Sequence, residues 1–76
     1  MNIVDVLISR VEANSDKNLF DINSILSEPT QENAVEKLES YIRLYSINSN
    51  ILQDAKRLKK QMEISVNENQ DNANNS

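Results

Sequence analysis

Residues 41–62 read YIRLYSINSNILQDAKRLKKQM, and side chains of one kind recur in them at alternating spacings of three and four. With one exception these side chains are aliphatic, aromatic or small, and together they are Tyr41, Leu44, Asn48, Ile51, Ala55, Leu58 and Met62. Such spacing brings its members to one side of an α-helix and is typical of a coiled-coil seam. The stretch therefore predicts a long helix with an apolar seam.

The predicted long helix runs from about 30 to about 65. Pro29 disfavours helical backbone at Glu28 but suits the first turn of a helix that follows it. Acidic side chains are frequent early in this helix and basic ones later, as the helix dipole favours. Pro29 is thus the expected break between this helix and whatever precedes it.

The first 27 residues are also predicted to be helical. One amphipathic segment covers 2–13, and a second covers 16–27. Asn14, Ser15 and Asp16 form a soft boundary, because such side chains bond locally to the backbone and favour helix caps. The two segments can be two short helices or a single bent one, and both readings stay open.

A second apolar stripe lies beside the seam in the earlier half of the long helix, and its members are Val35, Leu38, Ile42, Tyr45 and Leu52. We expect the N-terminal segment to fold back at Pro29 onto this stripe, which gives an all-α helical hairpin. At 1.5 Å per residue a helix over 2–27 reaches about 39 Å, and one over 30–65 about 54 Å. The last turns of the long helix, with Leu58 and Met62, should therefore extend past their partner.

The chain ends in the polar run NENQDNANNS, residues 67–76, which contains no large apolar side chain. Nothing in it offsets the entropy lost on ordering the backbone. We expect residues 1–66 to form the hairpin domain and residues 67–76 a disordered Asn-rich tail.

Composition excludes several classes of function. The 76 residues include no Cys, His or Gly, and the net charge is −4. Nucleophilic catalysis, metal binding and glycine-rich phosphate loops lack their usual residues, so we expect no enzyme, no cofactor and no metal site. An acidic chain with no apolar run of membrane-spanning length is expected to have no nucleic-acid or membrane partner, and to be cytoplasmic.

A basic cluster interrupts this acidity late in the long helix, at Lys56, Arg57, Lys59 and Lys60. It carries no interleaved aromatic side chains on which bases could stack. It is interpreted as a solvated face or as a contact for an acidic protein surface.

A hairpin this small has a limited core and no disulfide, so association with another chain is the expected source of further stability. The seam suggests self-association as a scaffold, adaptor or chaperone-type assembly factor, with Asn48 fixing the register of a homodimer. Two alternatives remain. The chain can be a small inhibitor that folds onto a cellular protein, or the seam can be the inner face of a hairpin. The richness of the whole sequence in Asn, Ile and Ser suits an AT-rich phage or mobile genome.

Overall fold

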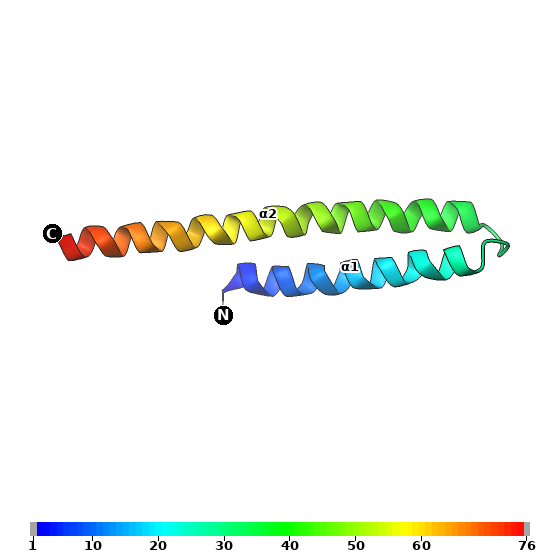
Figure 1. The fold of residues 1–76 in the computed structure, drawn as a ribbon, viewed down its shortest axis with the longest axis horizontal. Helices are drawn as coiled ribbons and strands as arrows, with labels where there is room; N and C mark the ends of the chain where they lie inside the picture. The colour runs from blue at the N-terminus through cyan, green and yellow to red at the C-terminus, as the bar shows by residue number, and fades with distance from the viewer. Residues whose placement is uncertain (1, 76) are drawn as a thin grey trace.

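The structure is an antiparallel pair of α-helices. A computed structural model describes the backbone of residues 2–75 and the side chains of residues 2–64. Helix α1 (Ile3–Ser27) and helix α2 (Ala34–Asn75) are joined by residues 28–33 and lie side by side over the length of α1 (Figure 1). The longest dimension of the molecule is 68 Å. No strand occurs within residues 2–75, so the predicted all-α class is confirmed.

Helix α1 is one continuous helix, which decides between the two readings that the sequence left open. Its N-terminus is capped by Asn2, whose side-chain oxygen accepts a hydrogen bond of 2.9 Å from the backbone N–H of Asp5. Asn14, Ser15 and Asp16 do not interrupt it. Ser15 is buried, so it serves the packed side of the helix instead of capping a second one.

The connection between the helices ends later than the sequence predicted, because α2 begins at Ala34 and not near residue 30. Asn33 has a φ of 58°, in the left-handed region that Asn tolerates better than most residues. Its carbonyl accepts the first hydrogen bond of α2, from the N–H of Lys37 at 3.0 Å. A left-handed residue cannot lie inside a right-handed helix, so Asn33 sets the start of α2.

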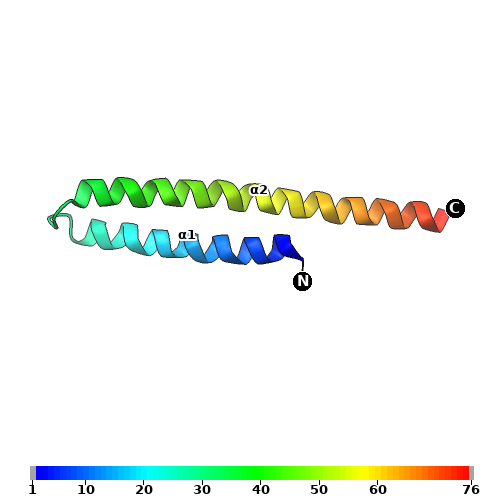
Figure 2. The same ribbon diagram turned by 180° about the vertical axis from the view of Figure 1, so that it is seen from behind.

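Helix α2 is much longer than α1, with 42 residues against 25, and it continues past the N-terminus of α1 (Figure 2). It also passes the end expected near residue 65 and reaches Asn75. The side chains of the predicted tail, residues 67–76, lie outside the described part of the chain. The division of the chain at residue 67 stays a prediction.

The two helices meet along stripes that both follow the three-and-four alternation. The stripe on α1 consists of the buried or half-buried residues Val4, Ile8, Val11, Ser15, Asn18, Ile22 and Ile25. The stripe on α2 consists of Leu38, Tyr41, Tyr45, Asn48, Leu52, Ala55 and Lys59. Each helix thus presents one stripe, two columns of side chains wide, to the other, and the core is one layer thick.

The middle of this core is polar. Near the open end of the hairpin, Lys59 lies 2.7 Å from Asp5 in an ion pair. At the connection, Ile25 and Leu38 line one hollow. Ser15 lies midway between Asp5 and Ile25 on α1. Because Lys59 and Leu38 are their neighbours on α2, the residue level with Ser15 is Asn48, to within about one residue.

Two polar atoms in this middle section are buried without a hydrogen-bond partner. They are the hydroxyl oxygen of Ser15 and the amide nitrogen of Asn18. A buried polar group that lacks a partner weakens folding by about 1–3 kcal/mol. These two groups therefore make the centre of the helix pair a source of lost stability.

Candidate protein interface

The seven seam residues predicted from the sequence divide between two sides of α2. Tyr41 and Asn48 are half-buried against α1, and Ala55 is 4% exposed. The other four are more exposed, at 49% for Leu44, 39% for Ile51, 48% for Leu58 and 39% for Met62. Leu58 lies at the edge of the contact, in a hollow that it lines with Val4 and Leu7 of α1. Met62 continues the row of Tyr41, Asn48 and Ala55 to the level where α1 begins. The first three form part of the hairpin core, and the other four remain open to a further contact.

The second predicted stripe divides in the same way. Leu38, Tyr45 and Leu52 are half-buried, whereas Val35 and Ile42 are exposed. Residues seven apart form one column along a helix, and α2 carries apolar residues in four adjacent columns, which begin at Val35, Leu38, Tyr41 and Leu44. A single neighbouring helix covers a width of about two columns. Helix α1 lies over the two middle columns, so it takes one column from each predicted stripe.

We define the outer stripe as Leu44, Ile51 and Leu58, three large apolar side chains spaced by seven residues on α2. Residues seven apart lie on nearly the same side of a helix, so the stripe runs parallel to the hairpin axis for about 21 Å. Ile47, which is 49% exposed, lies one turn from Leu44 and widens the stripe at that end.

A shallow apolar hollow adjoins the outer stripe at the open end of the hairpin. We call it the open-end hollow, and it is lined by Ile3, Val4, Val6, Leu7, Arg10 and Leu58. Leu58 thus belongs both to the outer stripe and to this hollow, which continues the apolar surface onto α1. Ile3 and Leu7 were not among the interface residues predicted from the sequence, which all lie on the long helix. The available signal was the width of the apolar pattern, since Ile3 and Leu7 fall outside the stripe that begins with Val4 and Ile8.

The predicted basic cluster does not form one continuous basic surface. Lys59 pairs with Asp5 across the hairpin, and Arg57 lies 3.5 Å from Asp54 on its own helix. Lys56 and Lys60 share a surface hollow with two acidic residues, Glu12 and Glu63. The hydrogen bond with Asp5, and then its negative charge, raise the pKa of Lys59 above its ordinary 10.5. The cluster is therefore largely balanced by local acids.

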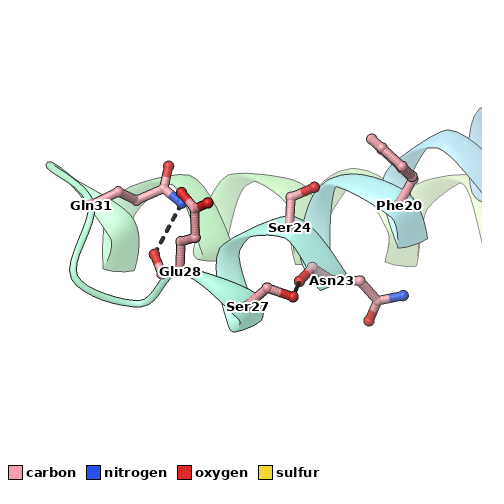
Figure 3. Close-up of a pocket in the computed structure, with 6 residues that line it drawn as sticks. All are labelled: Phe20, Asn23, Ser24, Ser27, Glu28 and Gln31. Atoms are coloured by element: carbon pink, nitrogen blue, oxygen red, sulfur yellow. Dashed lines mark hydrogen bonds between the residues drawn. The ribbon is translucent and has the colours of Figure 1, made fainter.

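Polar residues line a third surface hollow, at the end of α1 (Figure 3). Its polar groups bond within the chain: the hydroxyl of Ser27 donates to the carbonyl of Asn23, and the side chain of Gln31 donates to the carbonyl of Glu28. Phe20 at its edge is 70% exposed. These hydrogen bonds secure the end of α1 and the start of the connection.

Residues 2–64 bring together no group of three acidic side chains that could hold a metal ion, and neither helix is long and apolar enough there to cross a membrane. Comparisons with protein families, with curated proteins and with solved structures found no match. The outer stripe and the open-end hollow are the features from which a function can be argued.

Proposed function

We propose that this protein is a non-enzymatic assembly factor, a scaffold, adaptor or chaperone-type protein that works by binding a second copy of itself. The contact is made by the outer stripe of α2 together with the open-end hollow. Catalysis has no part in the proposal, because the chain contains no Cys or His, and the described hollows lie open at the surface.

The observation that carries the proposal is the balance of apolar side chains inside and outside the hairpin. Among the described side chains, four apolar ones are buried: Val4, Val11, Ile25 and Ala55. Fourteen large apolar side chains are exposed, and the outer stripe lies among them. The outer stripe and the open-end hollow meet at Leu58, and large exposed apolar patches mark protein interaction sites.

The small core of the hairpin also favours association. A core one layer thick with a polar middle leaves little surplus over the entropy of ordering two helices. Covering Leu44, Ile51 and Leu58 would add burial of about 25 cal/mol for every Å² of apolar surface removed from water. Docking a second copy on the outer stripe therefore stabilises each hairpin as well as joining the two.

The test is sedimentation equilibrium with circular dichroism across a dilution series. The wild-type protein should associate at micromolar concentration, and its helicity should fall on dilution. Leu58→Asp places a charge on the outer stripe and should abolish association. Phe20→Asp is the matched control, because Phe20 is an exposed apolar residue of α1 outside the stripe and the open-end hollow, and it should associate as the wild type does.

Two results would contradict the proposal. The first is a wild-type protein that stays monomeric and fully helical at all concentrations. The second is a Leu58→Asp variant whose oligomeric state and helicity match those of the wild type. A monomer that gains helix only with another protein would instead favour the inhibitor hypothesis.

A further inference from the structure

We infer that the second copy binds antiparallel, about a twofold axis at Ile51, with Leu44 of each hairpin seated in the open-end hollow of the other. This inference rests on the proposed self-association and adds its geometry. In such a dimer the side chain of Ile51 meets its own counterpart, and Leu44 meets Leu58 of the second copy. Three observations support this arrangement.

The first observation is that each hairpin carries both halves of the contact. The open-end hollow lies beside Leu58, and Leu44 and Ile47, each 49% exposed, lie at the opposite end of the outer stripe. Ile51 lies seven residues from both Leu44 and Leu58, so it is the midpoint. A twofold axis at that midpoint brings Leu44 and Ile47 of each chain over the open-end hollow of the other. In a twofold contact the same surface patch is used on both chains.

The second observation is an unequal distribution of charge along the hairpin. The half near the connection, residues 16–43, contains six acidic and three basic side chains. The open half, residues 2–15 and 44–64, contains five basic and four acidic ones. An antiparallel dimer brings unlike halves together, whereas a parallel dimer would place two acidic halves side by side. Like charges repel when they lie within the screening length of about 8–10 Å, and side-by-side helices bring their charges this close.

The third observation is the mismatch in helix length. Helix α2 continues to Asn75, well beyond Lys59, whose partner Asp5 lies in the first turn of α1, and α1 begins at Ile3. With the axis at Ile51, residues 60–68 of one copy run beside residues 34–42 of the other. The part of α2 that its own α1 cannot reach is thereby given a neighbour. A parallel dimer would leave both extensions next to each other, with no α1 beside either.

Disulfide trapping with single cysteines tests this geometry, because the natural chain contains no Cys that could interfere. Ile51→Cys should give a covalent dimer under mild oxidation, since the two sulfur-bearing positions face each other across the axis. Neither Leu44→Cys nor Leu58→Cys should form a covalent homodimer by itself. In that dimer position 44 of one copy lies about 21 Å from position 44 of the other, and the same holds for position 58. A mixture of Leu44→Cys and Leu58→Cys proteins should form the covalent heterodimer.

Phe20→Cys is the control for random collision, since Phe20 is exposed on α1 away from the outer stripe. It should crosslink far less than Ile51→Cys at the same concentration. Circular dichroism of each variant, and sedimentation of its reduced form, establish that the variants fold and associate.

The outcomes separate this geometry from the proposed function. Covalent homodimers of Leu44→Cys and of Leu58→Cys would show a parallel dimer, which overturns the antiparallel arrangement and leaves self-association intact. A dimer that is trapped best through Phe20→Cys would move the contact off the outer stripe and overturn both. Trapping through Ile51→Cys, together with the mixed pair, supports the arrangement.

Discussion

The ammonium group of Lys59 lies 2.7 Å from a carboxylate oxygen of Asp5, and this pair ties the N-terminus of α1 to the middle of α2. Both side chains are partly exposed, at 40% and 35%. Water and salt therefore screen the attraction, and the contribution to stability is modest. Its value for the fold is positional, because it is the described ion pair that joins the two helices.

We expect the contribution of this ion pair to the free energy of unfolding to decrease at alkaline pH. The pKa of Lys59 is raised in the folded state by its hydrogen bond with Asp5 and by that residue's charge. The contribution is therefore complete below the unfolded value of about 10.5 and is lost as the pH rises through the higher folded value. The melting temperature of the wild type minus that of Lys59→Gln should be constant from neutral pH to about 10 and then shrink. Lys60→Gln, which removes an exposed charge next to it, should show no such difference.

Ser15→Ala should raise the melting temperature. The substitution removes a buried hydroxyl that has no hydrogen-bond partner and leaves a side chain of similar size. A gain of about 1–3 kcal/mol is expected from the lost desolvation penalty. Ser9→Ala is the matched control, since Ser9 is exposed in the same helix and reports only the higher helix propensity of Ala. Equal gains from both substitutions would show that Ser15 is hydrated in solution.

Asn48→Leu should also stabilise the hairpin, by about 1 kcal/mol for the added apolar contact. Asn48 is half-buried on the side of α2 that faces α1, so the new side chain would lie inside the hairpin. Sedimentation should therefore give the same oligomeric species as the wild type. Mixed or higher oligomers would mean that Asn48 fixes the register between chains, as its place in the predicted seam first suggested. Asn50→Leu, on an exposed position, should change the melting temperature little.

Deleting residues 67–76 should leave both the melting temperature and the concentration dependence of association unchanged. These residues contain no large apolar side chain that could pack against a neighbour. Thermal melts of the two proteins at several concentrations make the comparison. A drop of several degrees would show that this end of the chain docks on the hairpin or on the second copy.

The sequence was sufficient to predict the two helical regions, because apolar residues at helical spacing and the absence of glycine leave few alternatives. It was insufficient to predict which side of α2 would face α1. Tyr41, Leu44 and Tyr45 are all large and apolar enough to pack, and they lie in three adjacent columns of one helix. Only the relative placement of two helices decides between them, and residue spacing within one helix holds no information about that placement.

The helix ends and the polar core residues were hard to predict for a related reason. Asn14, Ser15 and Asp16 resemble a capping sequence, and a local preference of this kind is worth about 1 kcal/mol. Packing along the whole of α1 outweighs it, so the helix continues and Ser15 is buried. At the start of α2 the reverse holds, since the left-handed backbone of Asn33 delays a helix that Pro29 could have begun.

The hairpin measures 68 × 17 × 15 Å, so it is about four times as long as it is wide. A rod of this shape experiences more hydrodynamic drag than a sphere of equal mass, and it leaves a gel-filtration column early. The monomer would therefore elute near the position of a compact globular protein of larger mass. Side-by-side association about an axis at Ile51 would thicken the rod more than it lengthens it, so elution volume would change less than the doubling of mass implies. Mass on this molecule has to come from sedimentation equilibrium or light scattering, which do not depend on shape.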